Sequence, residues 1–138
     1  MQKTPETSIL REDENGNIRS LDNLYMDGPA IFTFTIDVVP KTIYELLDKT
    51  DLALNDIDWF IFHQANEFML KHLINKLSIP KEKAPICLKE YGNTVSCTIP
   101  ITLKNCQEKG LFRKDDRIML ISFGVGYSWA SALIKRNN

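Results

Sequence analysis

Three apolar runs and one apolar stripe dominate the pattern of the chain. Residues 59–62 are all apolar, a run too short for a helix and typical of a strand buried on both faces. Residues 117–123 and 127–134 predict two further strands, joined by the turn residues Gly124-Val125-Gly126. Between the first two strands, helical spacing predicts one buried helix face. That face comprises Met69, Leu70, Leu73, Ile74 and Leu77.

Residues 91–110 predict a second helix, for which Gly110 is a suitable C-terminal cap. Pro100 lies inside this range, so one helical hydrogen bond is expected to be missing there. Cys97 lies within the same pattern and is expected to pack in the core. Residues 86–88 are compatible with a short strand. The apolar face of the predicted helix comprises Val95, Ile99, Leu103 and Cys106.

Residues 30–50 carry two conflicting patterns. Phe32, Phe34 and Ile36 alternate with threonines, which favours a strand over 30–39. Apolar residues also continue at helical spacing as far as Leu47, and Pro29 is well placed at a helix start, although Pro40 would kink that helix. Local propensity alone favours the strand.

Residues 1–23 are polar and form an excursion from the main domain, which we assign to residues 24–138. The excursion is too poor in large apolar residues to fold alone. Its Asn15-Gly16 pair tolerates positive φ and is compatible with the turn of a small hairpin.

Composition narrows the classes of function. The 138 residues suit one domain, and 17 basic against 18 acidic residues give a net charge of −1, which offers no case for a nucleic-acid partner. No apolar run approaches the ~20 residues that span a bilayer, so no membrane association is expected. The three cysteines are odd in number and suit reduced thiols of a cytoplasmic protein. Because the chain has only two histidines and no Cys-x-x-Cys pair, no metal site is predicted.

Polar side chains follow the first predicted strand directly. His63, Gln64 and Asn66 can all form directed hydrogen bonds, and ligands of open α/β sheets bind beyond the carboxyl ends of strands. The simpler alternative for His63 is a satisfied histidine at a strand end. Asn66 is also a good N-cap for the following helix. Asn93, beside Gly92, would likewise be explained as a cap or turn residue.

Three motifs in order nevertheless resemble one family. They are His63-Gln64-Ala65-Asn66, then Tyr91-Gly92-Asn93-Thr94 with Ile99-Pro100, then the terminal run from Phe123 to Trp129. Over about residues 24–135 the chain resembles the C-terminal half of 3-oxoacyl-(acyl-carrier-protein) synthase III, a condensing enzyme of the thiolase superfamily. The resemblance implies an α/β fold, half of a five-layer αβαβα arrangement with a mixed sheet and packed helices. It also implies a helix over 30–50, bent at Pro40.

The same resemblance implies an acyltransferase of fatty acid biosynthesis. Such enzymes join an acyl group, delivered by acyl-CoA to a cysteine, to malonyl-acyl-carrier protein with loss of carbon dioxide, and they need no further cofactor. His63 and Asn93 would be catalytic and stabilise the enolate. Asn66, Phe123, Gly124 and Val125 would bind substrate, Val125 through its backbone N–H. The nucleophilic cysteine belongs to the N-terminal half, so this chain alone is expected to be inactive.

Other interpretations remain open. Phe68 stands where family members often carry a basic residue that helps to bind acyl carrier protein, so a related enzyme of specialised or polysaccharide-linked metabolism is an alternative. A cysteine hydrolase using Cys97, His63 and Asn93 is disfavoured by order and spacing. A non-catalytic half-domain that serves only assembly is the third alternative. A homo-oligomer is expected, and apolar surface left uncovered by a missing half should promote self-association.

Overall fold

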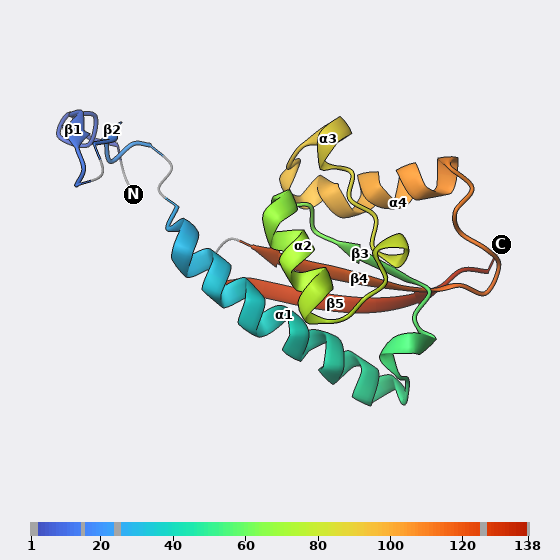
Figure 1. Ribbon diagram of the computed structural model, residues 1–138. Coiled ribbons are helices and arrows are strands. Elements are labelled where there is room, and N and C mark those ends of the chain that lie inside the picture. Colours follow the sequence, from blue (N-terminus) through green and yellow to red (C-terminus); the bar gives the residue numbers. More distant parts are fainter. Residues whose placement is uncertain (1–2, 15, 24–25, 125–126, 138) are drawn as a thin grey trace. The chain divides into compact units, whose positions relative to one another are not determined.

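The computed structural model describes residues 3–14, 16–23, 26–124 and 127–137 (Figure 1), and the chain divides between Ala30 and Ile31 into two compact units. Each unit is described by itself. The first contains β1 (Arg11–Glu12) and β2 (Ile18–Arg19). The helix α1 (Gly28–Thr50) begins in the first unit and continues into the second. The other α-helices and strands of the second unit are β3 (Trp59–Phe62), α2 (Glu67–Lys76), α3 (Leu88–Tyr91), α4 (Thr98–Glu108), β4 (Arg117–Gly124) and β5 (Ser128–Lys135). Three short 3₁₀ helices also belong to it: η1 (Leu54–Asp56), η2 (Lys81–Lys83) and η3 (Val95–Cys97).

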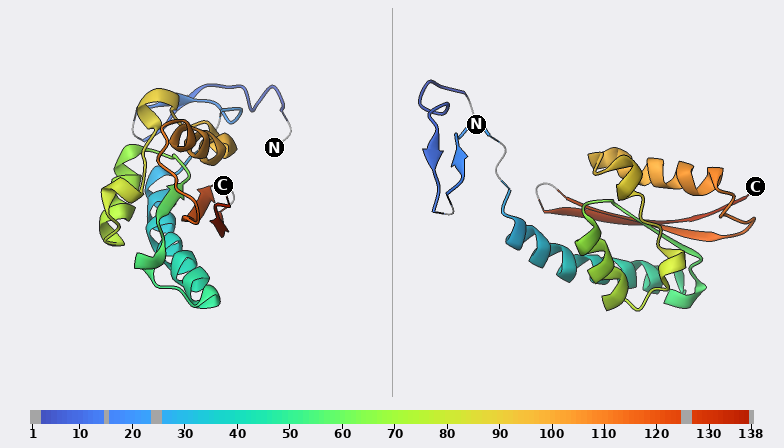
Figure 2. Two further views of the ribbon diagram at one scale, coloured as in Figure 1. Left: turned by 90° about the vertical axis from the view of Figure 1, so that its right-hand side faces the viewer. Right: turned by 45° about the horizontal axis from the view of Figure 1, so that its top comes forward.

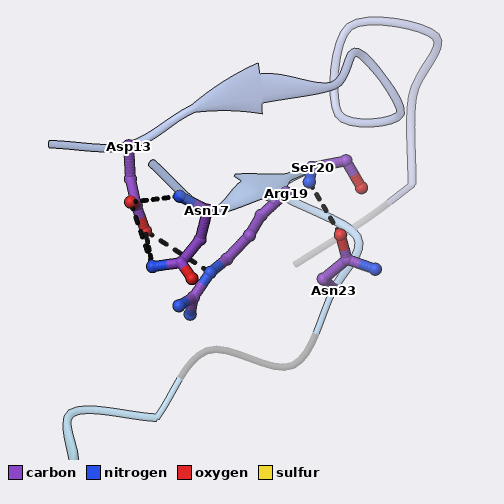
Figure 3. A network of polar contacts seen from close by, with 5 residues as sticks. All are labelled: Asp13, Asn17, Arg19, Ser20 and Asn23. Atoms are coloured by element: carbon purple, nitrogen blue, oxygen red, sulfur yellow. Dashed lines mark hydrogen bonds and ion pairs between the residues drawn. The ribbon is translucent and has the colours of Figure 1, made fainter. Parts of the chain in front are cut away.

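The first unit is built on an antiparallel hairpin in which Arg11 lies opposite Arg19. Gly16 has a φ of 78°, the left-handed conformation that glycine adopts without steric cost. The Asp13 carboxylate accepts a hydrogen bond from the backbone N–H of Asn17 at 2.9 Å and lies 3.4 Å from Nε of Arg19 (Figure 3). One carboxylate therefore ties the turn to the returning strand.

The second unit is organised around a three-stranded mixed sheet in the order β3-β4-β5. β3 and β4 are parallel, with Phe60 beside Met119, and β4 and β5 are antiparallel, with Phe123 beside Trp129. The three strands predicted from the apolar runs are confirmed. The predicted reversal at Gly124-Val125-Gly126 includes two residues, Val125 and Gly126, that lie outside the described residues.

Alternation along β3 sends its side chains to two separate cores. Phe60 and Phe62 pack with Met119 and with helices α1 and α2, whereas Ile61 packs with Cys106 of α4 on the opposite face. Figure 2 shows α4 on one side of the sheet and α1 with α2 on the other. The continuous apolar run is explained because both faces of β3 are covered. The predicted stripe of α2 is also confirmed, since all five of its residues are buried.

Helix α1 overturns the strand that local propensity favoured over residues 30–39. Packing of its apolar face, including Val39 and Ile43, against the sheet outweighs the β-favouring composition. The helix continues through Pro40, which has no N–H to donate to the carbonyl of Ile36. Lys76 of α2 supplies the missing donor, because its Nζ lies 2.7 Å from that oxygen.

Two predictions between residues 86 and 100 are wrong. Residues 86–88 form no strand, and Leu88 instead begins the short helix α3. The second helix begins at Thr98 and not near residue 91. Pro100 therefore lies in the first turn, where the backbone N–H groups have no partner inside the helix, so no hydrogen bond is lost. Val95 lies ahead of the helix and is 66% exposed, contrary to the predicted buried face.

One face of β5 carries the uncovered apolar surface that the sequence led us to expect. Ala130, Ala132 and Ile134 are exposed, while the sheet beside them is covered by α4.

Among the described residues, no helix has both the length and the apolar character that crossing a bilayer requires.

Candidate functional site

His63 is held rigidly at the carboxyl end of β3. Its backbone N–H donates to the carbonyl of Ile121 at 2.7 Å, which extends the parallel ladder beyond the strand. Its half-buried ring stands edge-on to Phe123, with centroids 5.3 Å apart. The strand and the buried phenylalanine together fix where the imidazole lies.

Asn93 approaches the same strand end from the loop before α4. Gly92 has φ 65° and ψ −163°, a conformation open essentially to glycine alone, and this aims the loop toward β3. Asn93 Nδ2 donates to the carbonyl of Ala65 at 3.3 Å, and Asn93 Oδ1 accepts from the N–H of Val95 at 2.9 Å. A primary amide has two N–H groups, so the second remains available to a ligand.

A third side chain, Thr98, joins the two segments. Its buried Oγ1 lies 2.6 Å from Nδ1 of His63 and 3.0 Å from the carbonyl oxygen of Val95. Val95 has a φ of 55°, which is strained for a β-branched residue and characteristic of functional loops. The loop from Asn93 to Thr98 is therefore bound to the His63 segment at both of its ends.

The two candidate donors, His63 and Asn93, thus lie at one end of one strand. Asn93 bonds to Ala65, two residues after His63, and His63 bonds to Thr98, five residues after Asn93. Neutral imidazole and carboxamide can both present N–H groups without bringing in a charge. Paired donors of this kind stabilise an oxygen that becomes negative during a reaction.

Gln64 braces the site from inside the protein. It is 2% exposed, and its Nε2 donates to the carbonyl of Phe62 at 3.0 Å while its Oε1 accepts from the N–H of Cys87 at 2.9 Å. A longer contact of 3.4 Å joins Nε2 to the carbonyl of Pro85. One amide therefore connects the end of β3 to the segment that leads into α3.

The remaining predicted substrate-binding residues have varied surroundings. Asn66 caps α2, because its Oδ1 accepts from the N–H of Met69 at 2.8 Å. Phe123 is buried against His63, and Gly124 pairs with Ser128 across the β4–β5 ladder. Val125 lies outside the described residues.

Two of the three cysteines, Cys87 and Cys106, are buried, and one is exposed. Cys97 is exposed, so its predicted core packing is wrong. Burial raises the pKa of the Cys87 thiol and raises that of Cys106 to about 11, which disfavours a thiolate at either position. In the described part of the chain, His, Cys, Asp and Glu side chains form no group of three that could hold a metal ion.

Thr98 and Thr94 belong to the candidate site by position, although the sequence pattern did not mark them. Thr98 looked like one position of a helix, and only its contact with His63 marks it. Thr94, beside Asn93, has a buried Oγ1 without a hydrogen-bond partner among the described residues.

The environment of His63 predicts a pH-dependent stability. Burial lowers the pKa of His63, and contact with the Val95 backbone opposes this only in part. Below about pH 6.5 the unfolded chain gains a proton that the folded chain resists. We therefore expect the free energy of unfolding to fall as the pH drops from about 6.5 through the pKa of folded His63.

Urea unfolding between about pH 5 and pH 8 tests this dependence. The His63→Gln variant should lack the loss of stability, whereas His72→Gln, a change at the chain's other histidine, should retain it. Equal pH slopes for the wild-type chain and His63→Gln would contradict the assignment.

Comparison with known proteins agrees with this arrangement. A family model described as the C-terminal part of 3-oxoacyl-[acyl-carrier-protein (ACP)] synthase III matches residues 47–136. A β-ketoacyl-[acyl-carrier-protein] synthase III from Clostridium tetani is 40% identical over 134 residues, which are 96% of this chain and 40% of the relative. The corresponding synthase of Streptococcus gordonii is 40% identical over 113 residues, 80% of this chain and 35% of the relative.

Solved structures give the same result. A 2.1 Å crystal structure of 3-oxoacyl-(acyl-carrier-protein) synthase III superposes with a TM-score of 0.92 at 39% identity, covering 96% of this chain and 40% of that one. The Thermus thermophilus synthase III has a TM-score of 0.79 at 31% identity, covering 91% and 40%. These matches confirm the expected α/β fold, the C-terminal half of a thiolase-like architecture. The chain spans about two fifths of the length of the relatives it matches.

Proposed function

The chain belongs to the 3-oxoacyl-(acyl-carrier-protein) synthase III family, and on that premise we propose that it forms the C-terminal portion of a decarboxylative acyltransferase. In the proposed reaction the malonyl thioester loses carbon dioxide, and the electron pair of the broken C–C bond forms an enolate. The enolate carbon attacks the acyl thioester on a cysteine, a new C–C bond forms, and the cysteine sulfur departs as thiolate.

His63 and Asn93 are proposed to stabilise the enolate oxygen. The observation that carries this proposal is that both side chains lie at the end of β3. His63 directly follows the strand and contacts Thr98 at 2.6 Å, and Asn93 donates to the carbonyl of Ala65 at 3.3 Å. Burial lowers the pKa of His63 and favours the neutral ring. A neutral donor suits a site that must first admit a carboxylate and then release carbon dioxide.

The nucleophilic cysteine is proposed to come from the N-terminal half. Buried Cys87 and Cys106 are poor thiolates, and Cys97 ends the 3₁₀ helix Val95–Cys97, whose Val95 N–H donates to Asn93. Asn66 is proposed to contact the pantetheine arm in addition to capping α2. Phe123, Gly124 and Val125 are proposed to line the acyl-transfer site, with acyl-CoA as the donor of the acyl group.

The surface around Phe68 supports a second candidate function. Phe68 is 72% exposed, and its ring lies 5.6 Å from that of Phe32. An exposed phenylalanine, backed by the partly buried Phe32, is a poor match for the acidic surface of a housekeeping acyl carrier protein. A carrier or acyl substrate of specialised or polysaccharide-linked metabolism is therefore the alternative, with the same chemistry at His63 and Asn93.

A chimera tests the proposed function. Joining this chain to the N-terminal portion of the Clostridium tetani synthase III should give an enzyme that condenses an acyl-CoA with a malonyl thioester. The chain alone should neither condense substrates nor gain an acyl adduct by intact-mass spectrometry. An adduct on Cys97, or a folded chimera that takes up the acyl group and yet never condenses it, would overturn the proposal.

A further inference from the structure

The hydroxyl of Thr98 has a single hydrogen to donate, and two possible acceptors lie beside it. Its Oγ1 lies 2.6 Å from Nδ1 of His63 and 3.0 Å from the carbonyl oxygen of Val95. Thr98 is only 2% exposed, so this oxygen meets protein groups rather than bulk water. The direction of that hydrogen decides which ring nitrogen of His63 carries a proton.

The two arrangements have different chemical consequences. If Nδ1 carries the hydrogen and donates to Thr98, then Nε2 of the neutral ring is bare and can only accept. If Thr98 donates to Nδ1, the hydrogen of the neutral ring lies on Nε2 and points away from Thr98. Only this second arrangement lets His63 donate to a developing enolate.

We propose that Thr98 is a positioning residue that donates its hydroxyl hydrogen to Nδ1 of His63 and so fixes the Nε2–H tautomer. This inference rests on the proposed function, because it assigns Thr98 a task in enolate stabilisation. The contact to Nδ1 is shorter than the contact to Val95, and an imidazole nitrogen is the more basic acceptor.

Nuclear magnetic resonance of the chain labelled with ¹⁵N-histidine reads the tautomer directly, because protonated and bare ring nitrogens have well-separated shifts. The chain has only two histidines, and His72, whose ring lies 5.3 Å from Phe32, serves as an internal control for folding. The wild-type chain at pH 8 should show His63 protonated on Nε2. A wild-type spectrum with the proton on Nδ1 would overturn the proposal, even if no variant can be prepared.

Two variants complete the test. Thr98→Val keeps the shape and removes the hydroxyl, so Nδ1–H should become the favoured tautomer, bonded to the Val95 carbonyl. Thr98→Ser keeps the hydroxyl and should retain the wild-type spectrum. In the chimera, Thr98→Val should lower kcat for decarboxylation of malonyl-coenzyme A by about 10²-fold with little change in KM, and Thr98→Ser should restore it.

The outcomes distinguish this inference from the proposed function. A Thr98→Val chain with an unchanged His63 tautomer refutes the role of Thr98 and leaves His63 as a donor. Loss of the Nε2–H tautomer without any change in kcat would instead count against His63 as the donor, and thereby against the proposed function.

Discussion

In the chimera, replacing His63 or Asn93 with alanine will slow the decarboxylation of malonyl-coenzyme A by about 10²–10³-fold each. The reason is that each variant removes one N–H donor aimed at the oxygen that becomes negative. The acyl-transfer half-reaction depends on the cysteine and its own oxyanion contacts, so acylation of the chimera should continue. Decarboxylation rates and intact-mass acylation, measured on the same samples, separate the two steps.

Matched controls lie on α2. His72→Ala and Asn75→Ala remove the same two residue types from exposed positions and should leave the rate of decarboxylation unchanged. Because His63 and Asn93 act on one oxygen, the double variant should lose less than the product of the two single effects. A His63→Ala chimera that decarboxylates at the rate of the unsubstituted chimera would remove the imidazole from the mechanism.

The central strand and the helix after it were predictable because their signals are local. The run 59–62 is apolar throughout, since both faces of β3 are covered, and α2 repeats its buried residues at helical spacing. Asn66 could be predicted as a cap for the same reason, because the bond from Met69 spans three residues.

Residues 30–39 show where local signals fail. Phe32, Phe34 and Ile36 fit one face of a strand, yet the same positions belong to α1. What decides between them is the sheet against which Val39 and Ile43 pack, together with the Lys76 donor that compensates for Pro40. Neither can be seen in a window of ten residues. The local patterns were divided between strand and helix, and the family resemblance decided for the helix.

The loop before α4 was missed for a related reason. Val95 and Cys97 match a helical apolar spacing, but Gly92 and Val95 have positive φ values, and the α-helix begins only at Thr98, after the short 3₁₀ helix Val95–Cys97. Those conformations are held by contacts to Ala65 and His63, about 30 residues away in sequence. Motif resemblance could name His63 and Asn93, whereas the geometry that connects them depends on the folded loop.

The second large effect is expected at Gln64. Replacing Gln64 with leucine should lower the free energy of unfolding by about 1–3 kcal/mol for each buried group left without a partner, foremost the N–H of Cys87. Leucine fills a similar volume, so the loss reports hydrogen bonds rather than a cavity. Gln107→Leu, at an exposed glutamine of α4, should change stability by no more than about 0.5 kcal/mol.

Gln64→Glu sharpens the test because it changes only one end of the side chain. The remaining oxygen can still accept from Cys87, but the Nε2 that served the carbonyls of Phe62 and Pro85 becomes a second carboxylate oxygen. A buried carboxylate facing two carbonyl oxygens is repelled by both, and its burial also costs the hydration that it has in the unfolded chain. Gln64→Glu should therefore be less stable than Gln64→Leu at pH 7, measured by urea unfolding.

Gln64→Glu should regain stability relative to Gln64→Leu as the pH falls, because the protonated acid can donate to one of those carbonyls again. If Gln64→Glu is instead as stable as the wild-type chain at pH 7, the amide does not brace the site as its contacts indicate.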